Sequence, residues 1–94
     1  MMDESRILEE LIRLLEQHAI PVKQDRGNFK GGLIRYHDEQ VFYLNRKTET
    51  AMKINLILEE LKHMDISQEN LSEDLRNYLD VRGLLSGNNS IHVT

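Results

Sequence analysis

Residues 30–45 read KGGLIRYHDEQVFYLN and residues 46–63 read RKTETAMKINLILEELKH, and this stretch decides the fold. Apolar, β-branched and aromatic residues at 29–36 and 41–45, joined by the polar residues 37–40, predict a β-hairpin. A polar segment then leads into a helix with an apolar stripe, which we expect to be capped by Thr48 or Thr50 and to end near Met64. The stretch therefore predicts a hairpin that feeds directly into a helix.

The flanking residues predict two further helices and an edge strand. Apolar residues recur on one side of residues 4–18, which indicates an amphipathic helix with Asp3 as its N-cap. Pro21 ends this helix and is tolerated in a short edge strand over residues 20–24. A third helix is expected from about residue 68 or 72 to residue 82, with Gly83 as its stop.

Together these elements predict an α+β fold. We expect an N-terminal helix, a two- or three-stranded antiparallel meander and two C-terminal helices packed on one sheet face. The helix stripes together with Leu33, Phe42 and Leu44 should form the core. The length of 94 residues fits one domain, which we place over residues 1–83, followed by a flexible C-terminal tail over residues 84–94.

The composition favours a soluble, cytoplasmic protein without a cofactor. The chain has no Cys, which excludes disulfides, thiolate metal sites and a thiol nucleophile. Its apolar runs are far shorter than the ~20 residues that span a bilayer, so we expect no membrane partner. No serine elbow and no glycine-rich phosphate loop are present, so we expect no enzyme of those classes.

The charge is distributed unevenly along the chain. The net charge is −4, but residues 23–53 hold seven basic and four acidic side chains, a balance of +3. Four of the five aromatic residues also lie there. A nucleic-acid binder using Lys30, Arg35, Arg46 and Lys47 is therefore an alternative. We do not expect nucleic acid as the partner, because the whole chain is acidic and aromatics in a short hairpin more often pack against a helix.

Residues 59–63 read EELKH and come close to the zinc-peptidase motif His-Glu-x-x-His. A strand ending in Asn45, a polar stretch and then a helix resembles the minimal ImmA/IrrE-type metallopeptidase core. That resemblance implies Glu60 as the general base and His63 as a metal ligand. The first His of the motif is replaced by Glu59, and Glu59 with His63 supplies only two ligands. We therefore expect no catalytic residues and no metal, with an inactive metallopeptidase-like domain as an alternative.

The glycine pair Gly31-Gly32 is unusual inside a strand. It indicates either a bulge or a place where another backbone or a ligand approaches closely. The run Gly-Gly-Leu-x-Arg, followed by a turn, a second strand and an Ile/Leu-rich helix, is also similar to a set of short bacterial proteins of uncharacterised activity. That similarity implies the fold but no mechanism.

The function we expect is a non-enzymatic protein-interaction module that acts through the hairpin surface. A protein partner, or a second copy in a homodimer, would bind there, because an exposed sheet edge and a modest core favour association. The candidate binding residues are Gly31, Gly32, Arg35, Tyr36, Tyr43 and Arg46.

Overall fold

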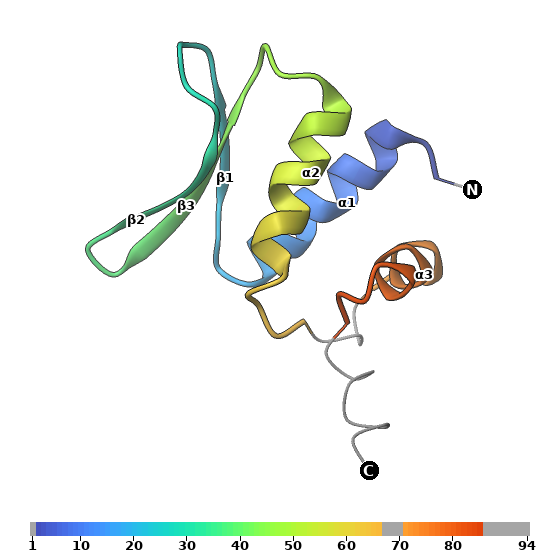
Figure 1. Ribbon diagram of the computed structural model, residues 1–94. Coiled ribbons are helices and arrows are strands. Elements are labelled where there is room, and N and C mark those ends of the chain that lie inside the picture. Colours follow the sequence, from blue (N-terminus) through green and yellow to red (C-terminus); the bar gives the residue numbers. More distant parts are fainter. Residues whose placement is uncertain (1, 67–70, 86–94) are drawn as a thin grey trace.

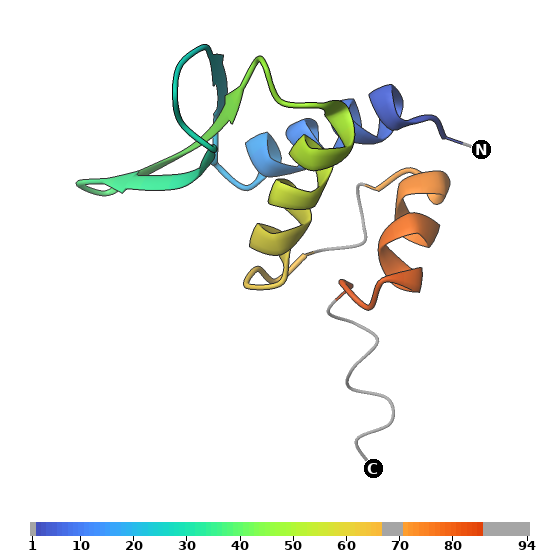
Figure 2. The same cartoon turned by 45° about the horizontal axis from the view of Figure 1, so that its top comes forward.

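Three helices and three strands occupy the part of the chain that the computed structural model describes, residues 2–66 and 71–85. In chain order they are α1 (Glu4–Gln17), β1 (Val22–Asp25), β2 (Gly32–Tyr36), β3 (Glu39–Asn45), α2 (Thr50–Leu61) and α3 (Glu73–Val81). The strands form one sheet at one end of the molecule, and α3 lies at the other end (Figures 1 and 2). The predicted α+β class is confirmed.

The sheet has the strand order β1-β3-β2. β2 and β3 form the predicted antiparallel hairpin, in which Leu33 lies opposite Phe42 and Tyr36 lies opposite Glu39. β1 lies on the other side of β3 and runs parallel to it, with Val22 opposite Phe42. The sheet is therefore mixed, with β3 in the centre.

The prediction of a purely antiparallel meander is wrong, because β1 does not pair with β2. Residues 26–31 carry the chain past the end of β3 before β2 begins. The two side chains that β3 buries most deeply, Phe42 and Leu44, are 1% and 0% exposed, whereas β1 is mostly exposed. The central position thus goes to the strand with the most apolar surface to bury, and β1 becomes an edge.

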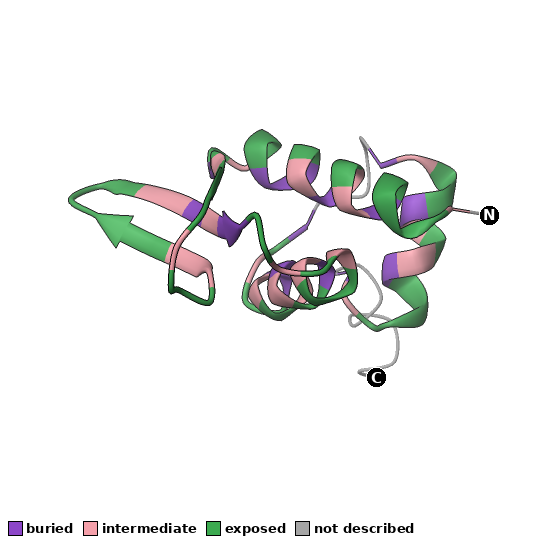
Figure 3. Ribbon diagram, turned by 90° about the horizontal axis from the view of Figure 1, so that it is seen from above, coloured by how far each residue is buried: buried purple, intermediate pink, exposed green. Residues whose placement is uncertain are grey.

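α1 and α2 cover one face of the sheet, and the core lies between them and β3 (Figures 1 and 3). Phe42 and Leu44 enter this core, as the sequence predicts, and Leu33 packs against it while partly exposed. The helices contribute the buried residues Ile7, Leu11, Leu14, Leu15, Ile54, Ile57 and Leu61. The helices therefore cover the inner face of the sheet at the base of β3.

α3 packs beside the other helices and away from the sheet (Figure 1). Ser72, just before α3, donates its hydroxyl to Glu10 Oε1 of α1 at 2.8 Å, and Leu75 and Leu79 of α3 are buried. The prediction that both C-terminal helices pack on a sheet face is wrong for α3. α1 takes that place, since the face of a three-stranded sheet is covered by two helices.

The helix ends agree with the sequence at α1 and α3 and differ at α2. Asp3 Oδ1 accepts from the Arg6 N–H at 2.9 Å, so the predicted N-cap of α1 is confirmed. Ser72 caps α3 in the same way. Glu49 is the N-cap residue of α2 and makes no side-chain cap hydrogen bond, so the predicted threonine cap is wrong. α2 ends at Leu61, before the expected Met64.

Beyond α3, the chain continues into the core. Gly83 has φ +70° and ends the helix, as the sequence predicts for a C-terminal glycine. Leu85, which the sequence analysis assigns to the tail, is only 2% exposed and belongs to the core cluster. The rest of the predicted tail, residues 86–94, lies outside the described residues.

Candidate functional site: the outer face of the sheet

The face of the sheet that points away from α1 and α2 is the most prominent candidate site. Side chains directly opposite one another on paired strands lie on the same face. Phe42 points inward, so the register places its neighbours Val41 and Tyr43 on the outer face, with Ile34 opposite Val41 and Lys23 opposite Tyr43. We call this surface, with Tyr36 and Glu39 at the hairpin end, the outer face.

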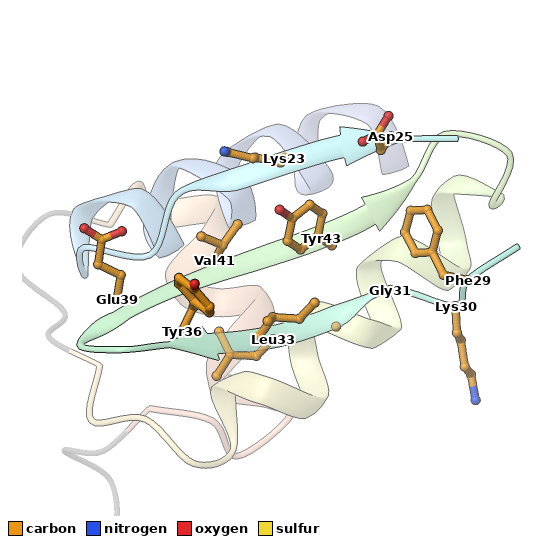
Figure 4. Close-up of a pocket in the computed structure, with 12 residues that line it drawn as sticks. Lys23, Asp25, Phe29, Lys30, Gly31, Leu33, Tyr36, Glu39, Val41 and Tyr43 are labelled. Carbon is orange, nitrogen blue, oxygen red and sulfur yellow. The ribbon is translucent and has the colours of Figure 1, made fainter. Parts of the chain in front are cut away.

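A groove of about 770 Å³ runs along the outer face. It lies over β1, β3 and β2 and is closed at one end by Phe29 (Figure 4). Tyr36 is 70% exposed, Ile34 51% and Phe29 37%, and these are three of the exposed large hydrophobic residues of the described chain. Val41 and Tyr43 are partly exposed between them. The groove floor is therefore apolar and aromatic.

Charged side chains lie around this apolar floor and balance one another. Lys23 and Lys30 carry positive charge, and Asp25 and Glu39 carry negative charge. All four are exposed, so they stay solvated at the margin of the groove. An apolar centre with a mixed polar rim is the usual layout of a protein–protein interface.

The hairpin that carries most of the groove extends beyond the helices (Figure 3). Residues 34–39 are all exposed, whereas the base of β3 at Phe42, Leu44 and Asn45 is buried. The end of the hairpin is thus accessible, while its base is fixed to the core.

Gly31 allows the strand to start close to β3. A Cβ atom at this position would lie 2.8 Å from the Tyr43 carbonyl oxygen, and the residue has φ +105°. Gly32 has φ +136°, but a Cβ atom there would meet nothing within 4 Å. The sequence offers two explanations for the glycine pair, a bulge or a close approach. The close approach of another backbone is confirmed at Gly31.

Asn45 holds the loop between β1 and β2 in place. It is the buried polar residue of the described core, at 5% exposure. Its Nδ2 donates to the carbonyl oxygens of Gly27 at 2.8 Å and Phe29 at 2.7 Å, and its Oδ1 accepts from the Lys47 N–H at 3.1 Å. One amide therefore ties the crossing loop to the end of β3 and positions Phe29 at the groove.

The structure brings together four of the six predicted binding residues. Gly31, Gly32, Tyr36 and Tyr43 line the groove. Arg35 and Arg46 do not belong to its lining. Arg35 alternates with Ile34 and Tyr36 along β2, so it falls on the other face, where it donates to Gln40 Oε1 at 3.2 Å. Arg46 follows the end of β3.

Sequence reasoning missed several groove residues. Phe29, Ile34 and Val41 line it, whereas the sequence predicts them only as strand positions. Alternation could have identified Val41, because apolar side chains lie on both faces of β3 and one set must remain on the outside. The sequence identifies Asn45 only as the last residue of a strand and does not predict its contacts with the loop.

The metal-site alternative gains no support from the described residues. His63 lies in the turn after α2, and its side chain is exposed. Glu59 is exposed and paired with Lys62, whose Nζ lies 3.0 Å from Glu59 Oε2. Within residues 2–66 and 71–85, no three His, Asp or Glu side chains gather in a way that would hold a metal ion. Glu59 and His63 thus lack a third ligand there.

The nucleic-acid alternative requires its four basic residues on one surface. Lys30 lines the groove and extends away from the sheet (Figure 4), whereas Arg35, Arg46 and Lys47 are outside the lining. The groove itself carries equal numbers of basic and acidic side chains, Lys23 and Lys30 against Asp25 and Glu39. The outer face therefore lacks the positive excess that phosphate binding needs.

A second, smaller cavity of about 300 Å³ lies between α1 and the start of α3. Three of its polar residues pair with one another: Arg6 Nε donates to Glu10 Oε2 at 3.0 Å, and Ser72 donates to the other oxygen of the same carboxylate. These contacts join two helices, so the cavity is part of the helix packing.

Comparisons of this chain with models of protein families, with curated proteins and with solved structures found no match. None of the helices in residues 2–66 and 71–85 combines the length and the apolar character needed to cross a bilayer.

Proposed function

We propose that this protein is a non-enzymatic interaction module that binds a protein partner through its outer face. The observation that carries the proposal is the groove of about 770 Å³ on the sheet face that the helices leave uncovered. Exposed apolar patches with a polar rim mark protein-binding surfaces, and aromatic residues are enriched at the centre of such interfaces.

The chemistry of the groove indicates the kind of partner. Tyr36, Tyr43 and Phe29 present ring faces and edges to solvent, and Ile34 and Val41 add aliphatic surface. A protein segment with apolar side chains would fill the floor, and its polar groups would meet the mixed charges of the rim. Because the rim is neutral as a whole, apolar contact rather than charge attraction would dominate the binding. The proposal places the protein in the cytoplasm, as the absence of Cys suggests.

Site-specific photo-crosslinking in the cells that produce the protein tests this proposal. The photoreactive residue p-benzoylphenylalanine is introduced at Phe29 and, separately, at Tyr36, because both positions already hold an exposed aromatic ring in the groove. We expect both variants to form an adduct with the same protein.

The control carries the photoreactive residue at Val81 of α3, which is 82% exposed and outside the groove. This position should give no adduct with that protein. Equal adducts at all three positions, or adducts at Val81 alone, would contradict the proposal.

A further inference from the structure

The two edges of the sheet differ in how they are protected. The edge formed by β1 follows the exposed Pro21 and carries Lys23 and Asp25, which are features that discourage pairing with another strand. β2 forms the other edge and contains neither proline nor lysine, and Arg35 is its one charge. β2 is therefore the less protected of the two edges, because it has one charge where β1 has two charges and a proline before it.

The backbone of β2 also presents free hydrogen-bonding groups. His37 and Asp38 form the two-residue turn of the hairpin, so the flanking pair Tyr36 and Glu39 is expected to be hydrogen-bonded. Ile34, two residues earlier, then also points its N–H and C=O at β3. Leu33 and Arg35, which alternate with Ile34 and Tyr36, direct their N–H and C=O groups to the free edge.

This edge is complementary to itself. In an antiparallel pairing of two β2 strands centred on Ile34, Leu33 of one copy faces Arg35 of the other, and both have outward backbone groups. Gly32 of one copy then faces Tyr36 of the other on the outer face. An aromatic ring over a cross-strand glycine covers backbone that the glycine leaves exposed. The same register thus pairs the outward backbone groups of the two strands and places the Tyr36 ring over the Gly32 backbone.

We propose that a second copy of this chain pairs antiparallel along β2, with the two Ile34 residues facing each other at a two-fold axis. This inference goes beyond the proposed function, because it concerns the β2 edge and leaves the outer-face groove uncovered. The two sheets would become one continuous sheet, and the two outer-face grooves would lie side by side. No like charges lie directly opposite each other in this register, since Arg35 faces Leu33.

A second copy fits this edge better than an unrelated strand. The pairing uses every residue of β2, and the exposed side chains Ile34 and Tyr36 find apolar neighbours in the other copy. The two copies have a net charge of −4 each, but the paired strands themselves carry only the charge of Arg35, which faces Leu33. The hairpin is thus a part of this acidic chain where two copies can meet without strong repulsion.

Single-cysteine variants test the register, because the natural chain has no Cys. Facing residues of a non-hydrogen-bonded antiparallel pair have Cα atoms about 4.5 Å apart, within the range of a disulfide. Ile34→Cys should therefore form a disulfide-linked dimer under mild oxidation. Tyr36→Cys is the matched control on the same strand and face. Its two copies would be about 13 Å apart along the strands, too far for a disulfide.

We expect Ile34→Cys to cross-link at least about tenfold faster than Tyr36→Cys, because only the first pair meets the distance requirement. Arg35→Pro removes the outward N–H but no hydrogen bond to β3, so the variant should remain folded. In light scattering, the natural chain should be a dimer and Arg35→Pro a monomer. Equal rates for the two cysteines, or an unchanged dimer in Arg35→Pro, would overturn the pairing.

The two proposals fail separately. If the natural chain is a monomer at every concentration while the Phe29 and Tyr36 photo-adducts contain another protein, the self-pairing is wrong and the interaction module stands. If the cysteine dimer forms but the photo-adducts are no stronger than at Val81, the proposed function is wrong.

Discussion

Replacing Asn45 by aspartate should lower the free energy of unfolding by about 2–4 kcal/mol at neutral pH. The substitution keeps the size of the side chain but replaces the Nδ2 donor by a carboxylate oxygen. That oxygen would face the carbonyl oxygens of Gly27 and Phe29, which now accept at 2.8 and 2.7 Å. Two hydrogen bonds are lost and a charge is placed where only 5% of the residue is exposed. Denaturant unfolding of both proteins measures the difference.

Asn28→Asp is the matched control for this substitution. It makes the same chemical change at an exposed position of the same loop. Its effect should stay within about 0.5 kcal/mol, as for most surface substitutions. If Asn45→Asp were as mild as Asn28→Asp, the amide would not hold the loop.

The two glycines of the hairpin should respond differently to alanine. Gly31→Ala should cost about 2–4 kcal/mol, because a Cβ atom 2.8 Å from the Tyr43 carbonyl oxygen adds overpacking to the strain of a positive φ. Gly32→Ala meets no atom within 4 Å and should cost only the strain of its φ, about 1–2 kcal/mol.

Thermal and denaturant unfolding of the two alanine variants give this comparison directly. Each variant serves as the control for the other, since the glycines are adjacent and share a positive φ. A cost at Gly32 equal to or larger than that at Gly31 would mean that the close approach to Tyr43 does not limit the side chain at Gly31.

The local elements of this fold could be predicted from the sequence because each is encoded within a short segment. The 3.6-residue stripe and Asp3 predict α1, and the short polar turn between apolar runs predicts the β2–β3 hairpin. The expected core residues Phe42 and Leu44 of β3 are confirmed. These features depend on neighbours in the sequence.

The strand order could not be predicted in the same way. Pairing of consecutive strands is the commonest arrangement, but β1 pairs with β3 because residues 26–31 cross the end of that strand. The crossing depends on Asn45 reaching carbonyl oxygens 16 and 18 residues earlier in the chain. A single asparagine at the end of a strand gives no sign of such distant partners.

The candidate site was predictable only in part for a related reason. The sequence identifies the hairpin and Gly31 as candidates. Whether Tyr36 and Val41 lie in the core or on the surface depends on which side of the sheet the helices cover. Arg35 lies on the face opposite to Tyr36, and the sequence of the hairpin alone does not show which residues share a face with the groove. Once the face on which Phe42 lies is known, the register determines the face of every other residue in the hairpin.

The rate of amide hydrogen exchange at Leu33 and Arg35 tests most directly whether the projecting hairpin binds a second copy of the chain along β2. Both amides point to the free edge of β2, so they should exchange rapidly in dilute solution and slow down as the protein concentration rises. The amides of Ile34 and Tyr36, bonded to β3, should change much less. If Leu33 and Arg35 exchange equally fast at every concentration, while residues of α1 or α3 become protected instead, two copies of the chain do not pair along β2.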